Sequence, residues 1–285
     1  MSEHDSLMPA PTPPLPLAAL RGEIDRIDAA IHALLVERGE VVGRVIDAKR
    51  AAGDVGSAFR PDREAALMRS IVLKNPGRWP VDAPENIWRV ILATSTFTQV
   101  PYAVHADVSG GDMPIRESMR FHFGFTVPFR PAPDAAGVIA AVDASTGDLG
   151  MFLIAQPAIS GAWWLGLTWP GAPKIIARLP FAERADHPVG LPVYVIARPQ
   201  NEGLARETIV AALTLERWRK EADGALNALG AELVASAGDA QGARLLIAHP
   251  ADISAQALTD ALVRVKCAAH SYCEIGCHAK RFVIA

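Results

Sequence analysis

The sequence has few cysteines, little net charge and no long uninterrupted run of apolar residues. Its only cysteines, Cys267, Cys273 and Cys277, lie close together near the C-terminus, and an odd, late cluster is not a disulfide framework. A formal charge of −3 at pH 7 gives no global attraction to nucleic acid or to an anionic membrane. Without about 18 consecutive apolar residues, no membrane-spanning helix is expected.

The first residues also lack the features of a targeting sequence. Residues 1–16 are acidic at the start and proline-rich afterwards, with no apolar run behind basic residues, so they resemble neither a signal peptide nor a transit peptide. Proline has no backbone donor and resists helix formation, so we expect this segment to be a disordered arm. The sequence therefore predicts a cytoplasmic protein.

After this arm comes a long amphipathic pattern. From Leu17 to about Arg50, apolar residues recur at steps of three and four, charged residues fill the other faces, and no proline interrupts. The pattern predicts one helix about 50 Å long at 1.5 Å per residue. A helix of that length has to bury its apolar face against other long helices or against another subunit.

Two shorter helices are expected next. Pro61 suits the first turn of a helix that runs to about Ile71, and a third helix is expected from about Pro84 to about Gln99. Gly110 and Gly111 lie in a segment typical of a linker. The expected domains are an all-helical domain over residues 17–105, a linker over 106–117 and a second domain over 118–285.

The hydrophobic period changes in the second half. Phe121, Phe123 and Phe125 alternate as in a strand, and strand patterns then alternate with helical ones, which predicts an α/β or α+β domain. Trp163 and Trp164 favour core packing over a ring-stacking ligand site. Strands are expected at 150–154, 174–177, 192–197, 232–235 and 244–248, and helices at 134–142, 205–229 and 255–266.

Cations on the long helix suggest a binding site. Arg38 and Lys49 are 11 residues apart, so they share one face and could grip one small molecule between them. Arg21 lies about 25 Å from Arg38 along the helix. Within one chain it cannot meet the same small ligand, but an antiparallel copy of this helix from a second subunit could bring Arg21 there.

Polar residues on the two shorter helices could complete this site. Arg60, Arg63 and Glu64 are spaced so that they can line one face, and Ser95 and Gln99 face one way on the third helix. Pooled with the cations of the long helix, they make a cavity rich in positive charge with one carboxylate and two neutral hydrogen-bonding groups. That composition suits a small dianion that carries a hydroxyl group.

These residues resemble the all-helical chorismate mutases. The likeness lies in LAALRGEIDRIDAAIHALLVERGEVVGRVIDAKR, in FRPDRE and in ILATSTFTQ, and it covers residues 17–100. It implies a three-helix domain that forms an intertwined homodimer with shared active sites. It also implies conversion of chorismate to prephenate, a pericyclic step in phenylalanine and tyrosine synthesis that needs no metal and no cofactor.

The resemblance also implies a role for each site residue. Arg38 and Arg21 of the partner subunit would bind the two carboxylates, with support from Arg63 and Ser95. Lys49 and Gln99 would donate to the ether oxygen, and Glu64 would hold the ring hydroxyl. Arg60 is placed on the substrate-binding side, where some family members have an acidic residue. The catalytic set is thus Arg38, Lys49, Glu64 and Gln99, and the substrate-binding set is Arg21, Arg60, Arg63 and Ser95.

Two other functions stay open. An isochorismate–pyruvate lyase would use a similar cationic pocket on the same fold, but Glu64 favours the mutase because it gives the ring hydroxyl a partner. A non-catalytic regulatory protein would instead bind an aromatic metabolite through the second domain.

The second domain resembles prephenate dehydratase, from Met119 to about Arg198. The likeness lies in AAGVIAAVDASTGDLGMFLIA, KIIARLPF and GLPVYVIAR. The active-site signatures of that family are absent, because Ala155-Gln156-Pro157 stands in place of Glu-Asn-Ser and Pro192-Val193-Tyr194 in place of Thr-Arg-Phe. We therefore expect a degenerate relative with a structural or ligand-sensing role, and no dehydration.

The C-terminal cysteines and histidines are candidate zinc ligands by residue type. Cys267, His270, Cys273, Cys277 and His278 carry suitable ligand atoms, but their spacing matches no standard zinc finger. Free cysteine is often simply buried. The sequence therefore predicts no metal site.

Overall fold

The computed structural model describes residues 16–53, 58–75, 77–154, 161–199, 202–239 and 242–284. The expected disordered arm lies outside the described residues, except for Pro16. Contacts divide the chain into two compact units, residues 1–55 and residues 56–285. The two units are described separately below.

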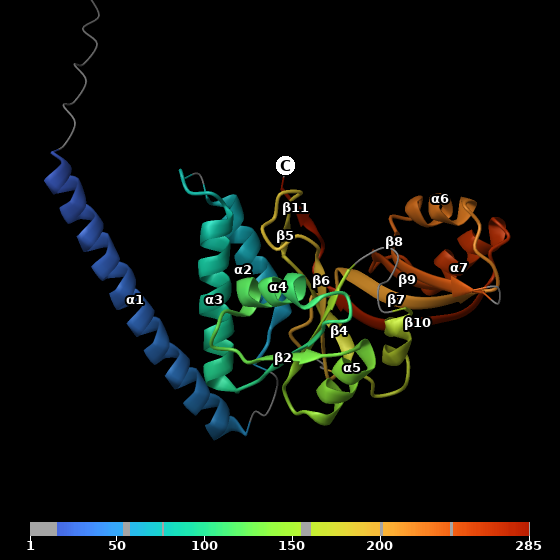
Figure 1. The fold of residues 1–285 in the computed structure, drawn as a ribbon, viewed down its shortest axis with the longest axis horizontal. Helices are drawn as coiled ribbons and strands as arrows, with labels where there is room; N and C mark the ends of the chain where they lie inside the picture. The colour runs from blue at the N-terminus through green and yellow to red at the C-terminus, as the bar shows by residue number, and fades with distance from the viewer. Residues whose placement is uncertain are drawn as a thin grey trace, which may run out of the picture. The chain divides into compact units, whose positions relative to one another are not determined.

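The first unit contains one long helix, α1 (Leu17–Ala52), shown in blue in Figure 1. It begins at the expected residue and ends at Gly53, whose left-handed conformation (φ 65°) lets its N–H donate to the Arg50 carbonyl at 3.2 Å. None of the residues of α1 is buried within the chain. Apolar side chains such as Ile24 (57% exposed) and Leu34 (63% exposed) therefore have no core of their own to join.

The second unit opens with the two shorter helices, α2 (Pro61–Leu73) and α3 (Asp82–Gln99), both confirmed. They contact each other, and α3 also contacts α4 (Asp112–Phe123). Met68 of α2 and Ala93 of α3 belong to the same core as Phe123. The boundary between the two compact units therefore lies before α2 and not within residues 106–117.

The expected linker and the first expected strand of the second half are wrong. Residues 106–117 complete strand β1 (Val104–Asp107) and form the first half of α4. Phe121 and Phe123 belong to the last turn of α4, whereas Phe125 lies beyond it and is 84% exposed. Burial follows the four-residue step of Ile115, Met119 and Phe123, so the helical period prevails over a short alternation.

The rest of the unit is built on one large mixed sheet, which confirms the expected α/β class. Its strand order is β2-β1-β3-β6-β4-β10-β7-β9-β8. At one end, β1, β2 (Phe129–Ala132) and β3 (Leu149–Leu153) run parallel, with α4 and α5 (Ala135–Ala144) as crossovers. Next to them, β6 (Val193–Ala197) pairs antiparallel with β3 and with β4 (Lys174–Leu179).

The other end of the sheet is a β-α-β-β-α-β arrangement of the ferredoxin-like type. Within this part, neighbouring strands are antiparallel to one another. In chain order the elements are β7 (Thr208–Leu215), α6 (Glu221–Asn227), β8 (Glu232–Asp239), β9 (Gly242–Pro250), α7 (Ala255–Arg264) and β10 (Ala269–His278). The warm colours of Figure 1 mark this part.

The helix expected over residues 205–229 is wrong in its first half. Thr208–Leu215 form β7, which lies inside the sheet and is buried along most of its length. A strand covered on both faces has a continuous apolar run and not an alternating one, so TIVAALTL could not be told from a buried helix. Only Glu221–Asn227 are helical in this range.

The two halves of the sheet meet where β10 pairs parallel with β4, at Gly276 and Ile175. Gly276 has φ +150°, and a Cβ there would overlap the backbone of Ile175. Only glycine allows this close approach of the two strands. Beyond β10, β11 (Phe282–Val283) pairs parallel with β5 (Ala182–Glu183) in a separate two-stranded sheet.

The tryptophan cluster is mainly core, as expected. Trp163 and Trp164 are buried in a short 3₁₀-helix, and Trp163 stacks on Phe152 at 4.1 Å between ring centroids. Trp169 is 44% exposed. Among the described residues, no helix combines the length and the apolar character needed to cross a bilayer.

Candidate functional site

Three of the expected site residues lie on α1. Arg38 and Lys49 are half-buried and Arg21 is exposed. Their spacing along a continuous helix keeps Arg38 and Lys49 on one side of it, as the sequence indicated. The first unit therefore presents two partly shielded cations on one face and a third cation near the other end of the helix.

The three residues expected to form a cluster at the start of α2 differ in their surroundings. Arg60 is half-buried, with Nη1 3.9 Å from Glu202 Oε2, and Arg63 is exposed. Glu64 is only 5% exposed. The three side chains thus differ in exposure, from buried at Glu64 to exposed at Arg63.

Glu64 has a partner that the sequence reasoning missed. Arg89 Nη1 on α3 donates to Glu64 Oε2 at 2.5 Å, and Arg89 is only 1% exposed. The Arg89 guanidinium lies 5.8 Å from the ring centre of Phe123 and 5.3 Å from that of Phe181. Buried charges are normally paired in this way, because an unpaired one is costly. The signal that could have found Arg89 is its place on the buried stripe of α3, with Glu85, Ala93 and Thr96.

Ser95 and Gln99 lie together on a different side of α3. Gln99 Nε2 donates to the Ser95 carbonyl at 3.1 Å, and Ser95 Oγ donates to the Ile91 carbonyl at 2.7 Å. At 100° per residue, Ser95 is about 120° and Gln99 about 80° around the helix from Arg89. The structure thus brings Ser95 and Gln99 together, about 80° to 120° around α3 from the arginine that binds Glu64.

Several buried polar groups surround the Glu64–Arg89 pair. Burial, and next the negative charge of Glu64, raise the pKa of Tyr102. Burial, and next the positive charge of Arg89, hold the pKa of His122 well below its usual range. On the same stripe, Glu85 Oε2 lies 3.2 Å from Arg184 Nη1 and 3.3 Å from His187 Nε2. This side of α3 is therefore an enclosed network of charged and polar groups.

Buried neutral histidines should make the fold sensitive to acid. Burial lowers the pKa of His278 to about 4 and that of His122 well below 6.5. As the pH falls below about 6.5, the unfolded chain binds protons that the folded chain does not, so the free energy of unfolding should fall. His278 alone should account for about 2 kcal/mol between pH 7 and pH 5.

Urea unfolding at pH 7 and at pH 5 checks this prediction. The His278→Gln variant, which cannot titrate, should lose less stability over the same range. Equal pH dependence of the two proteins would contradict the assignment to His278.

The C-terminal cysteines are separate from one another in this fold. Cys267 and Cys277 are buried, Cys273 is half-buried, and all are free thiols. Within the described ranges, no group of three or more histidine, cysteine, aspartate and glutamate side chains is arranged to hold a metal ion.

Comparison with known proteins identifies a family for the N-terminal part. Residues 20–100 match the family model of chorismate mutase type II, which confirms the resemblance of the three helices to that family. The match covers less than a third of the chain. No curated protein matches the sequence.

Two solved structures are similar to this chain in fold. Prephenate dehydratase from Streptococcus mutans is 13% identical, with a TM-score of 0.40 over 64% of this chain and 99% of its own. A protein described as a novel type of quorum-quenching acylase is 15% identical, with a TM-score of 0.38 over 61% of this chain and 93% of its own. At this level the likenesses assign no activity.

Proposed function

We propose that this protein is a chorismate mutase, which converts chorismate to prephenate without a cofactor and works as a homodimer with shared active sites. The observation that carries the proposal is the match of residues 20–100 to chorismate mutase type II. That range includes every residue of the expected site. Residues 17–105 would be the mutase module, and residues 118–285 a regulatory or ligand-sensing module.

The chemistry needs positive charge and confinement, not a nucleophile. The rearrangement is unimolecular, so the protein has to hold the compact conformer of a dianion and stabilise charge on the breaking ether oxygen. In the proposal, Arg38 and Arg21 of the partner subunit bind the carboxylates, with Arg63 and Ser95 in support and Arg60 nearby. Lys49 and Gln99 donate to the ether oxygen, where charge separation is largest in the transition state.

Glu64 is proposed to accept a hydrogen bond from the ring hydroxyl while it stays paired with Arg89. Arg89 bonds to Oε2, and a carboxylate has a second oxygen with further lone pairs. The proposal therefore assigns the hydroxyl to Oε1. In this arrangement Arg89 fixes the direction of the Glu64 carboxyl group.

The exposed apolar face of α1 supports the dimer. None of the 36 residues of this helix is buried, and a long amphipathic helix needs its apolar face covered to be stable. A second, antiparallel copy would cover leucine and isoleucine side chains that are now 40–64% exposed and would bring Arg21 to Arg38.

Incubating the full chain with chorismate, and separately with isochorismate, tests the function. We expect prephenate from chorismate. Salicylate and pyruvate from isochorismate, with no prephenate from chorismate, would replace the mutase with the lyase. If the folded protein turns over neither substrate, the mutase and the lyase are both excluded. The protein would then be a non-catalytic one that binds an aromatic metabolite.

Mixing two inactive variants tests the shared site. Arg21→Ala and Arg38→Ala should each be inactive alone, because each removes one carboxylate partner from every site. Mixed dimers contain one site with both arginines, so the mixture should regain up to about a quarter of wild-type activity once subunits exchange. Turnover after mixing is the measurement, with exchange confirmed by mass-labelled subunits. No recovery despite exchange would contradict a site built from two subunits.

A further inference from the structure

Helix α2 carries part of the proposed mutase site but is contacted by segments from the second half of the chain. Arg63 and Glu64 lie on it, and Arg60 precedes its first turn. Two segments far away in the sequence contact it, residues 202–207 and residues 279–284. The first, here called the incoming connection, leads into β7, and the second, the outgoing connection, follows β10. The chain therefore enters and leaves the ferredoxin-like part against α2.

The incoming connection contacts the first turn of α2. The Asp62 N–H donates to the Gly203 carbonyl at 3.2 Å, which gives an acceptor to one of the N–H groups that lack a partner within the helix. Gly203 has φ +74°, and a Cβ there would lie 2.6 Å from Cδ of Arg60. Because Gly203 has no side chain, the backbone of the incoming connection can lie directly against Arg60.

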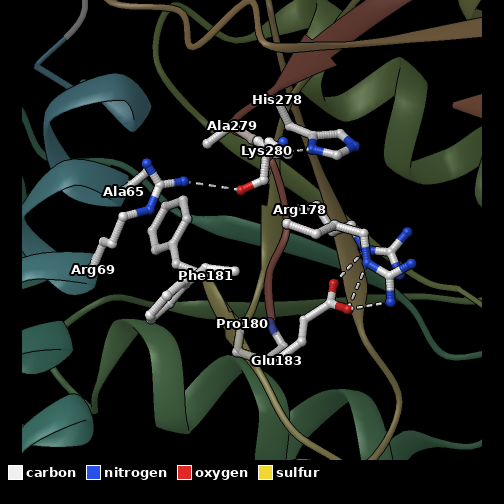
Figure 2. Close-up of a pocket in the computed structure, with 11 residues that line it drawn as sticks. Ala65, Arg69, Arg178, Pro180, Phe181, Glu183, His278, Ala279 and Lys280 are labelled. Atoms are coloured by element: carbon white, nitrogen blue, oxygen red, sulfur yellow. Dashed lines mark hydrogen bonds and ion pairs between the residues drawn. The ribbon is translucent and has the colours of Figure 1, made fainter. Parts of the chain in front are cut away.

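The outgoing connection contacts the other half of α2. Arg69 Nη2 donates to the Lys280 carbonyl at 3.2 Å (Figure 2), and the Arg69 guanidinium lies 5.7 Å from the ring centre of Phe282. The same Nη2 is 4.0 Å from Glu207 Oε2, which also accepts from the Lys280 N–H at 2.8 Å. Glu207 belongs to the incoming connection, so the two connections and Arg69 are joined at one point.

The outgoing connection is itself fixed to the rest of the second unit. Its strand β11 pairs with β5, and Arg281 Nε donates to Glu183 Oε2 at 2.7 Å. Arg178 Nε of β4 donates to the other oxygen of Glu183 at 2.7 Å (Figure 2). Arg281 Nη1 also donates at 2.9 Å to Oε2 of Glu232, the first residue of β8. A shift of the ferredoxin-like part would therefore pull on the segment that holds Arg69.

The position of α2 matters because of the groups that it would present to chorismate. In the proposed mechanism Arg63 and Glu64 contact a carboxylate and the ring hydroxyl, which are present in the substrate and in the transition state alike. The proposed donors to the ether oxygen, Lys49 and Gln99, lie on α1 and α3. Interactions common to both states lower KM, whereas those gained only in the transition state raise kcat. A loosely held α2 should therefore weaken substrate binding more than it slows the rearrangement.

We propose that Arg69 and Gly203 are positioning residues of the mutase, through which the two connections of the ferredoxin-like part hold α2 in place. The inference rests on the proposed function, because the groups on α2 are those of the proposed site. Neither residue contacts the substrate. Arg69 acts through Glu207 and the Lys280 carbonyl, and Gly203 acts through the start of α2.

Replacing Arg69 with glutamine in the full chain tests the outgoing connection. KM for chorismate should rise about fivefold with kcat within about twofold, because α2 is loosened while the ether-oxygen donors stay in place. Arg116→Gln is the matched control, since Arg116 is also a helix arginine with a carboxylate partner and a phenylalanine ring beside it, and it should change neither constant. A purely structural loss would lower kcat through fewer active molecules and leave KM unchanged. That result would overturn the role of Arg69.

Replacing Gly203 with alanine tests the incoming connection. The new Cβ would displace the flexible Arg60 side chain, so KM should rise about threefold or more. Gly190→Ala is the matched control, because Gly190 has a similar φ of +68° but no atom within 4 Å of the added Cβ. Both variants put a side chain into a left-handed conformation, but only Gly203→Ala should change KM. Equal KM values for the two variants would overturn the role of Gly203.

Amide hydrogen exchange of the full chain without substrate tests the hold on α2 apart from any activity. Exchange over residues 61–73 should be about fivefold faster or more in Arg69→Gln, with residues 255–264 of α7 unchanged as the internal control. Normal turnover together with unchanged exchange in α2 would overturn the hold and leave the mutase standing. Faster exchange in α2 with no chorismate turnover by the wild type would overturn the proposed function, and the kinetic role of both residues with it.

Discussion

Replacing Lys49 with alanine should lower kcat for chorismate by about 100-fold or more, with a smaller change in KM. In the proposed mechanism the Lys49 ammonium donates to the ether oxygen, which gains negative charge as its bond to carbon breaks. A donor that acts mainly on the transition state contributes about 3–4 kcal/mol, and its loss appears in kcat. Steady-state measurement of chorismate loss by the full chain gives both constants.

Arg50→Ala is the matched control for this variant. Arg50 is the next residue on α1, and its side chain is 77% exposed in a weak pair with Asp47. Removing it also deletes one positive charge from the same turn of the helix but should leave kcat within about twofold, because exposed pairs contribute little. Near-normal turnover by Lys49→Ala, or an equal loss in Arg50→Ala, would contradict the role proposed for Lys49.

Replacing Arg89 with methionine should lower the free energy of unfolding by about 3–5 kcal/mol. The substitution keeps most of the side-chain volume but leaves the Glu64 carboxylate buried without its ion-pair partner. Breaking a buried pair from one side is costly because the remaining charge has lost its water and gains nothing in return. Urea unfolding at pH 7, followed by tryptophan fluorescence, measures the loss.

The double variant separates this charge effect from a loss of packing. With Glu64→Met and Arg89→Met together, no buried charge is left over, so most of the stability should return. If the double variant is as unstable as Arg89→Met alone, the pair is not the cause. The same protein tests the role of Glu64, since a folded double variant without mutase activity supports the proposed contact with the ring hydroxyl.

The three N-terminal helices could be predicted from sequence because their signals are local. The apolar steps of α1, Pro61 at the start of α2 and Pro101 beyond α3 depend on nothing elsewhere in the chain. Strand β7 was missed because its burial on both faces comes from neighbours in the sheet, and residues 208–215 alone do not reveal them. The strand expected at Phe121 is wrong because an alternation of only three residues is too short to establish the two-residue period of a strand.

The candidate site was only partly predictable for a similar reason. The order of cations and polar groups from Arg21 to Gln99 is visible in the sequence and matches a known family. The surroundings of Glu64 are not visible, because Arg89 becomes its partner only when Phe123 and Phe181 exclude water from that side of α3. An arginine on an amphipathic helix is normally expected on the solvent face.

The position of β10 has a consequence for how the chain reaches its folded form. This strand is made after β4, β6, β7, β8 and β9, yet it lies between β4 and β7 in the middle of the sheet. Until residues 269–278 leave the ribosome, β4 and β7 have unpaired edges that could join the edges of other nascent chains. Assembly of the sheet therefore has to wait until β10 has been synthesised, and chaperones that shield exposed strand edges should raise the yield of folded protein.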